Sequence, residues 1–112
     1  MDTKLPHPLD RLYGRILERE SAPPEGSYTA KLLREGIGKI AKKVGEEAVE
    51  TALAAVARDK SAVIGESADL LYHLLVLWAA SGIAPEEIYL ALDARAGRSG
   101  LAEKESRTDE EN

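Results

Sequence analysis

The sequence ESADLLYHLLVLWAA occupies residues 66–80 and contains the longest apolar run of the chain. Projected as a helix, it has apolar residues on all sides, and a helix that is hydrophobic all round is normally buried. The run at residues 70–80 is interrupted by His73 and is shorter than the roughly 18 residues that a membrane span needs. We therefore predict a buried core helix from about residue 62 to residue 80.

Two carboxylates lie within this predicted core helix. Glu66 and Asp69 are three residues apart, so they are neighbours on one face. An unpaired buried carboxylate costs several kcal/mol unless it is protonated, ion-paired or bound to a metal. Protonation or a lysine compensates one such group, whereas a divalent cation compensates several at once. We favour the cation.

A second acidic stretch, GEEAVE at residues 45–50, lies on a long predicted helix that ends near residue 58. Glu46, Glu47 and Glu50 share one face with Lys39 and Lys43. A solvated stripe of lysine–glutamate pairs is the ordinary explanation. However, the lysines precede the glutamates, which is the weaker orientation, and Glu46 repels Glu50 at a spacing of four residues. The apolar side of this helix is predicted to consist of Leu33, Ile37, Ile40, Ala41, Val44, Ala48, Ala52 and Ala55.

The two acidic stretches predict a metal site between two helices. Packed helices lie about 8–10 Å apart, so Glu47 and Glu50 can face Glu66 and Asp69. Four carboxylates without cysteine suit Mg²⁺ or Mn²⁺, and Mg²⁺ on carboxylates usually keeps positions open for substrate phosphates. A di-iron bundle would need Glu-x-x-His pairs, which are missing here. His73 is expected to bond Asp69 or line the pocket, or else to be a core histidine with its hydrogen bonds satisfied.

The remaining sequence predicts further helices and a single all-α domain. Periodic apolar residues predict a helix to about residue 19, residues 21–27 form a loop by their prolines and glycine, and Pro85 begins a last helix that fades near Gly97. Gly36 indicates either a break in the long helix or a close backbone approach. We predict an antiparallel four-helix bundle in one domain, 1–112, with a helical core at 8–100 and a polar segment at 101–112.

Composition narrows the possible functions. The chain has 112 residues, a formal net charge of -5 and no cysteine. These values argue against disulfides, thiolate metal sites and general nucleic-acid binding. No basic, apolar leader opens the sequence, so we expect a cytoplasmic protein.

The acidic motifs also carry a family resemblance. EExxE at residues 46–50 followed by ExxD at residues 66–69 resembles the all-α nucleoside triphosphate pyrophosphatases, the MazG-like superfamily. SYTAKLL at 27–33, KKVGEEAVE at 42–50, ESADLLYHLLVL at 66–77 and SGLAEKESR at 99–107 are similar to the phosphoribosyl-ATP pyrophosphatase family. This resemblance implies a dimeric, Mg²⁺-dependent, cytoplasmic enzyme that hydrolyses phosphoribosyl-ATP to phosphoribosyl-AMP and pyrophosphate, the second step of histidine biosynthesis.

Site residues follow from the motifs in part and from the resemblance in part. The resemblance implies that the metal ligands are Glu47, Glu50, Glu66 and Asp69. Glu50 or Glu46 is a candidate for taking the proton of the attacking water, and Lys39 and Lys43 for binding phosphate oxygens. Lys104 and Arg107 match a basic pair that the resemblance places near substrate phosphate or the subunit contact. Two other functions stay open: a house-cleaning pyrophosphatase for other nucleotides, and a non-catalytic helical dimerisation module.

Overall fold

The computed structural model describes residues 7–96, and this part of the chain consists of helices and connecting turns without a strand. The all-α prediction is confirmed. The α-helices are α1 (Pro8–Glu18), α2 (Tyr28–Glu35), α3 (Ile37–Val56), α4 (Lys60–Ala80) and α5 (Pro85–Ala96), and two short 3-10 helices, η1 (Arg19–Ser21) and η2 (Pro24–Gly26), lie between α1 and α2.

Capping side chains set the starts of these helices. The Ser27 hydroxyl accepts from the Ala30 amide at 3.1 Å and begins α2, and the Asp59 carboxylate accepts from the Ala62 amide at 3.0 Å and begins α4. Such caps satisfy amides that have no partner in the first helical turn. Gly82, with φ of 72°, ends α4 as the sequence predicts.

Gly36 divides the long helix predicted from the sequence into α2 and α3. Its φ of 97° and ψ of 176° lie in a region that only glycine adopts readily. A Cβ at this position would meet no atom within 4 Å, so the backbone conformation and not a close approach requires glycine. The first of the two alternatives for Gly36, a break, is therefore the correct one, and the described residues form five α-helices where the sequence predicted four.

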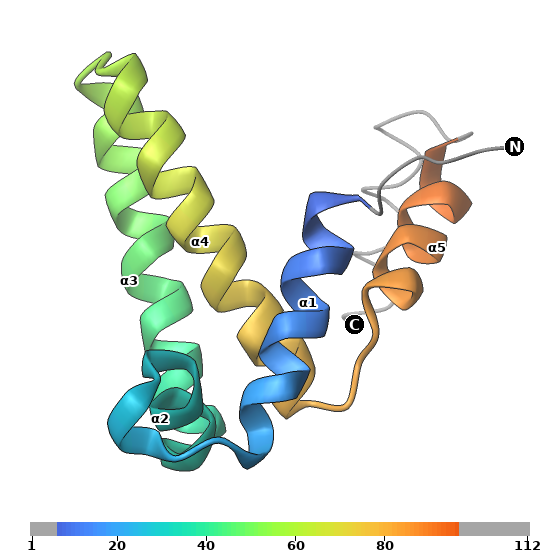
Figure 1. Ribbon diagram of the computed structural model, residues 1–112. Coiled ribbons are helices and arrows are strands. Elements are labelled where there is room, and N and C mark those ends of the chain that lie inside the picture. Colours follow the sequence, from blue (N-terminus) through green and yellow to red (C-terminus); the bar gives the residue numbers. More distant parts are fainter. Residues whose placement is uncertain (1–6, 97–112) are drawn as a thin grey trace, which may run out of the picture.

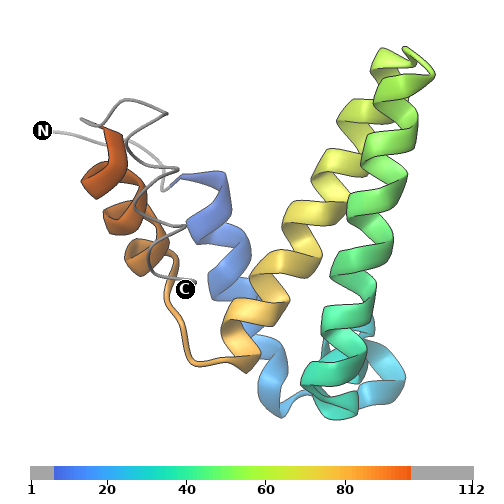
Figure 2. The same cartoon turned by 180° about the vertical axis from the view of Figure 1, so that it is seen from behind.

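The helices are arranged around one long antiparallel pair (Figure 1). α3 and α4 run side by side over their whole length and are joined by a short turn; we call this pair the α3–α4 hairpin. α2 lies at the foot of the hairpin and α1 packs against the C-terminal half of α4. Figure 2, from behind, shows the upper part of the hairpin standing clear of α1 and α5.

The core lies at the foot of the hairpin, where α1, α2, α3 and α4 meet. Its members are almost completely buried, and partly buried residues such as Tyr13 and Trp78 pack around them. The fully buried large side chains are Ile16, Leu32, Ile40, Leu75 and Val76. This core packs α2 against α4.

The upper half of the hairpin corrects two expectations about burial. α4 is buried only in its C-terminal half, because its N-terminal half has α3 alone as a neighbour; Ile64 is 65% exposed there. On α3, the predicted core positions Ala48, Ala52 and Ala55 are exposed, while Glu47 is partly buried. Residues 7–96 therefore leave uncovered an apolar face that the sequence pattern predicts to be covered.

Replacing Gly36 by alanine tests the break between α2 and α3. We expect Gly36→Ala to lower the free energy of unfolding by about 1–3 kcal/mol, the typical cost of a strained backbone conformation. Gly38→Ala, two residues later and inside α3, is the matched control: its Cβ also meets nothing within 4 Å, so it should raise stability by up to about 1 kcal/mol. Urea denaturation measures both, and equal effects would contradict the assignment.

Candidate metal centre

Three carboxylates converge between α3 and α4. Glu47 on α3, and Glu66 and Asp69 on α4, each offer one oxygen, and these three oxygens lie within 4.8 Å of one another. Glu47 and Glu66 are partly buried, and Asp69 is exposed. The antiparallel pairing of the hairpin brings residues about twenty positions apart in the sequence to the same level, so the cluster follows from the turn that joins α3 to α4.

Two oxygens of this cluster lack the partners that buried polar atoms usually have. Glu47 Oε2 and Glu66 Oε2 are buried and have no hydrogen-bond partner among residues 7–96. Buried polar atoms are normally satisfied, because an unsatisfied one bears its full desolvation cost. Unpaired anionic oxygens beside other carboxylates are the donor set that a hard divalent cation requires.

The spacing of the oxygens is compatible with such a cation after a small contraction. Around Mg²⁺, with metal–oxygen distances of about 2.1 Å in an octahedron, neighbouring ligands lie about 3 Å apart and opposite ones about 4 Å apart. The three oxygens here spread over as much as 4.8 Å. Without a cation the carboxylates repel one another, so the side chains are expected to move inward when the charge is neutralised.

Glu50 adjoins this cluster through Glu66. A hydrogen bond between their side chains is the largest cause that raises the pKa of Glu66 from 4.5 to about 7, followed by desolvation and by the negative charges of Glu50, Glu47 and Asp69. A hydrogen bond between two carboxyl groups requires a proton on one of them. All four acids predicted from the sequence are therefore brought together, three as one group and Glu50 beside Glu66.

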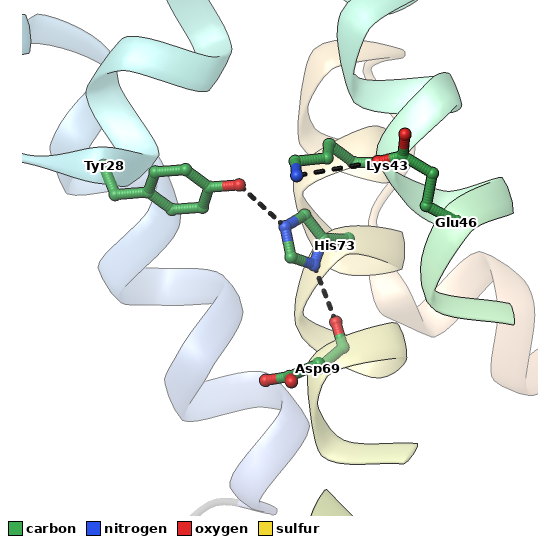
Figure 3. Close-up of polar contacts among 5 residues, drawn as sticks. All are labelled: Tyr28, Lys43, Glu46, Asp69 and His73. Carbon is green, nitrogen blue, oxygen red and sulfur yellow. Dashed lines mark hydrogen bonds and ion pairs between the residues drawn. The ribbon is translucent and has the colours of Figure 1, made fainter. Parts of the chain in front are cut away.

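The other predicted site residues are distributed differently. Glu46 is not a member of the three-carboxylate group; it forms an ion pair with Lys43, with 3.6 Å between Oε1 and Nζ (Figure 3), as the alternative of a lysine–glutamate stripe predicts for this pair. Lys39 is exposed one turn earlier on α3. Lys104 and Arg107 lie outside the described residues.

Two hollows adjoin the hairpin. A groove of about 780 Å³ follows α3 and is bordered by Lys42, Gly45, Glu46, Val49 and Glu50. A smaller one of about 360 Å³ lies near the C-terminal end of α4, between Arg34 and Ala79, and contains no member of the carboxylate cluster. Of the two hollows, the groove is the one that adjoins the carboxylates, because Glu50 belongs both to its border and to the acidic group.

His73 lies one helical turn beyond Asp69 and is almost completely buried. Its Nδ1 is 2.8 Å from the backbone carbonyl oxygen of Asp69, and its Nε2 is 3.1 Å from the hydroxyl of Tyr28 on α2 (Figure 3). The expectations that His73 bonds Asp69 and that it is a satisfied core histidine are thus both met. Reasoning from helical spacing missed Tyr28; the only signal for it was the SYTAKLL segment of the family resemblance.

The chain is similar to known proteins over most of its length. The profile of the phosphoribosyl-ATP pyrophosphohydrolase family matches residues 9–96. The chain belongs to this family. Proteins named phosphoribosyl-ATP pyrophosphatase from Azospirillum brasilense and Paramagnetospirillum magneticum are 58% and 54% identical over 88% of this chain, covering 89% and 91% of their own lengths. One from Granulibacter bethesdensis is 56% identical over 88% of this chain and 62% of its own length.

Membership of the pyrophosphohydrolase family covers every described helix, since the match from residue 9 to residue 96 spans α1 to α5. The four clustered acids all lie inside the matched region. The resemblance stated from short motifs is thereby confirmed over most of the chain.

The raised pKa of Glu66 predicts an unusual pH dependence of stability. Its folded-state pKa of about 7 exceeds the ordinary 4.5, so the folded chain holds this proton more tightly than the unfolded chain does. Its contribution to stability is therefore complete below pH 4.5 and is lost as the pH rises through 7. In EDTA, we expect the melting temperature to fall between pH 5 and pH 8, and Glu66→Gln to flatten that fall.

Addition of Mg²⁺ gives a second measurement of the proton on Glu66. A cation competes with the shared proton, so Mg²⁺ should raise the melting temperature of the unaltered chain more at pH 8 than at pH 6. Glu66→Gln should show a smaller rise at both pH values. A pH profile identical in the two proteins would contradict the assignment of the shared proton to Glu66.

Proposed function

We propose that this chain hydrolyses phosphoribosyl-ATP to phosphoribosyl-AMP and pyrophosphate, the second step of histidine biosynthesis, with Mg²⁺ as cofactor and Mn²⁺ as a substitute. The observation that supports it is the convergence of Glu47, Glu66 and Asp69, two of them with unpartnered buried oxygens, in a chain of the phosphoribosyl-ATP pyrophosphohydrolase family. The substrate is inferred from the names of the relatives, and the metal-dependent hydrolysis is inferred from the clustered carboxylates.

The acids divide into metal ligands and a proton acceptor. Glu47, Glu66, Asp69 and Glu50 would hold Mg²⁺, which when bound offsets phosphate charge and lowers the pKa of a coordinated water. Glu50 hydrogen-bonds to Glu66, and that bond is the largest cause of the raised pKa of Glu66. That favours Glu50 as the group that takes the proton of the attacking water. Glu46, paired with Lys43, is the weaker candidate.

Lysines on α3 supply positive charge on the open side of the site. Lys43 is partly exposed beside Glu46, and its pairing at 3.6 Å is a surface contact that a phosphate can replace. Lys39 lies one turn away and Lys42 borders the groove along α3. We assign Lys39 and Lys43 to the binding of triphosphate oxygens that the metal does not contact.

We also propose that the enzyme is a homodimer formed through the α3–α4 hairpin. Val49, Leu53 and Val56 on α3 and Ile64 and Leu71 on α4 are between 42% and 82% exposed. Monomers rarely expose contiguous apolar patches of this kind. Two antiparallel helices with an open apolar face become a four-helix bundle when a second copy covers that face. The predicted four-helix bundle would then form between two chains, because the described residues of one chain do not complete it.

The proposed location is the cytoplasm, without a membrane or nucleic-acid partner. By length and composition α4 is a helix that could cross a bilayer, with a mean hydropathy of 1.3 over its best window. Glu66 and Asp69 lie within it, where an ionised side chain costs about 3 kcal/mol in lipid. A subunit interface therefore explains its apolar surface better than a membrane does.

Removing a carboxylate tests the metal site directly. We expect Glu47→Gln and Asp69→Asn to stay folded by circular dichroism and to lose at least about 100-fold in Mg²⁺-dependent pyrophosphate release from phosphoribosyl-ATP, because each takes an anionic ligand from the cation. Glu18→Gln on α1, equally conservative and outside the hairpin, is the control and should retain normal turnover. Unchanged turnover in Asp69→Asn would refute the site.

The substrate itself decides between the two catalytic hypotheses. Comparable pyrophosphate release from dCTP or dUTP would favour a house-cleaning enzyme. No release from any nucleotide, with a melting temperature that Mg²⁺ and Mn²⁺ leave unchanged, would favour the non-catalytic module.

Placing a charge in the exposed apolar face tests the dimer. Leu53 is 62% exposed on α3, so Leu53→Glu should leave the isolated chain folded but bury a carboxylate in the dimer interface. Sedimentation velocity should then show a monomer. Leu92, 61% exposed on α5, is the matched control, and Leu92→Glu should remain dimeric. A dimer that survives Leu53→Glu would place the interface elsewhere.

A further inference from the structure

Tyr28, in the first turn of α2, is half exposed and is nevertheless held by its neighbours. Its hydroxyl lies 3.1 Å from Nε2 of His73, which is almost completely buried. The ring of Tyr72 lies beside the Tyr28 ring, with the two planes inclined by 25° and the centroids 6.2 Å apart. A bond between the hydroxyls of Thr29 and Tyr72 fixes this second ring. The exposed part of the Tyr28 ring is therefore an ordered aromatic surface.

This aromatic surface lies next to the metal centre, on the side of α2. Because α3 and α4 are antiparallel, one turn back along α3 matches one turn forward along α4. One turn before Glu47 on α3 is Lys43. One turn after Asp69 on α4 is His73, and residues four apart on a helix have Cβ atoms about 5–6 Å apart. Figure 3 shows Tyr28 from α2 and Lys43 from α3 on two sides of His73.

Three kinds of group thus follow one another from the metal centre toward the foot of the hairpin. The carboxylates come first, and the partly exposed Lys43 and the Tyr28 ring follow one turn later. A nucleoside triphosphate has a matching order, because its phosphates and its base are attached to opposite ends of the sugar. In the other direction the hairpin contains no aromatic residue from position 51 to position 65. An aromatic contact for the base is therefore available only on the side of α2.

We propose that the Tyr28 ring, with Tyr72 beside it, stacks on the purine base of the substrate. The proposal rests on the proposed function, since it takes the ligand to be a nucleotide whose phosphates meet the clustered carboxylates. Every base has a flat face that can stack on an aromatic side chain. A ring that its neighbours already hold loses little freedom when a ligand binds, so more of the stacking energy contributes to affinity.

Two substitutions of Tyr28 separate the ring from its hydroxyl. Tyr28→Leu removes the aromatic face, whereas Tyr28→Phe keeps it and removes only the bond to His73. For Tyr28→Leu we expect the KM for phosphoribosyl-ATP to rise about tenfold, with kcat changed less than about twofold, because stacking is equally strong before and during the reaction. The KM of Tyr28→Phe should stay within about threefold of that of the unaltered chain, since the flat face remains.

Tyr89→Leu is the matched control. Tyr89 lies on α5, which packs on α1, and its hydroxyl donates to Oδ1 of Asp10 at 3.1 Å. The same substitution there removes a ring and a hydrogen bond at another place and should leave KM unchanged. Inorganic tripolyphosphate, which has no base, gives a second control. It should inhibit the unaltered chain and Tyr28→Leu with equal inhibition constants.

Proton NMR of the tyrosine rings detects stacking without turnover. A base stacked on a ring shields the ring protons, and adenosine carries the base and ribose without any phosphate. In EDTA, adenosine should therefore shift the Tyr28 resonances upfield and leave those of Tyr89 in place. The spectrum of Tyr28→Leu identifies the Tyr28 resonances by their loss.

Four results would overturn the proposal. They are an unchanged KM in Tyr28→Leu, an equal rise in Tyr28→Leu and Tyr28→Phe, weaker inhibition of Tyr28→Leu by tripolyphosphate, and Tyr28 resonances that adenosine does not shift. Conversion of Tyr28→Leu to a monomer in sedimentation velocity would instead assign the ring to a subunit contact. If the unaltered chain releases no pyrophosphate from any nucleotide, the proposed function fails by that result, whereas the adenosine titration still tests the stacking surface by itself.

Discussion

The α3–α4 hairpin brings several carboxylates close enough to repel one another. The rest of the structure has to hold the two helices together against that repulsion. Glu47, Glu66 and Asp69 converge because an antiparallel helix pair matches residues on either side of its turn. A chain selected only for stability would have placed apolar residues there, since a buried carboxylate costs more than it returns. The pKa of Glu66 is raised first by its hydrogen bond with Glu50 and then by desolvation and the neighbouring negative charges. The hairpin is thus destabilised locally, and the proposed Mg²⁺ would reverse this destabilisation.

The rest of the fold makes this repulsion tolerable. The core at the foot of the hairpin, with Ile40 and Leu75 fully buried, holds α3 and α4 together below the acids. The break at Gly36 lets α2 fold back so that its first turn reaches α4. Above the core, apolar residues such as Leu53 and Ile64 are left exposed by the described part of the chain. A second copy would add the apolar contacts that a lone hairpin lacks at the level of the cluster.

Local sequence determines where the helices begin and which side chains share a face, but it does not determine which surface covers an apolar stripe. Caps such as Ser27 and Asp59 set helix starts that the sequence predicts closely, and the spacing of Glu66 and Asp69 predicts their shared face. The sequence did not predict what covers the apolar side of α3. Periodicity identifies an apolar stripe but not whether the same chain or another covers it, so Ala52 was assigned to the core although it is exposed in the part of the chain that the structure describes. Residues 97–112, including Lys104 and Arg107, lie beyond the described part.

Contacts between distant residues form the second limit of sequence reasoning. Tyr28 and His73 are 45 positions apart, and no spacing rule joins them. The same limit applies to specificity. Carboxylates recognise a cation and, through it, any polyphosphate, so Glu47 and Asp69 are equally suited to phosphoribosyl-ATP and to a free nucleotide. Discrimination between substrates must come from residues that contact the sugar and the base, and here the assignment depends on the family match over residues 9–96.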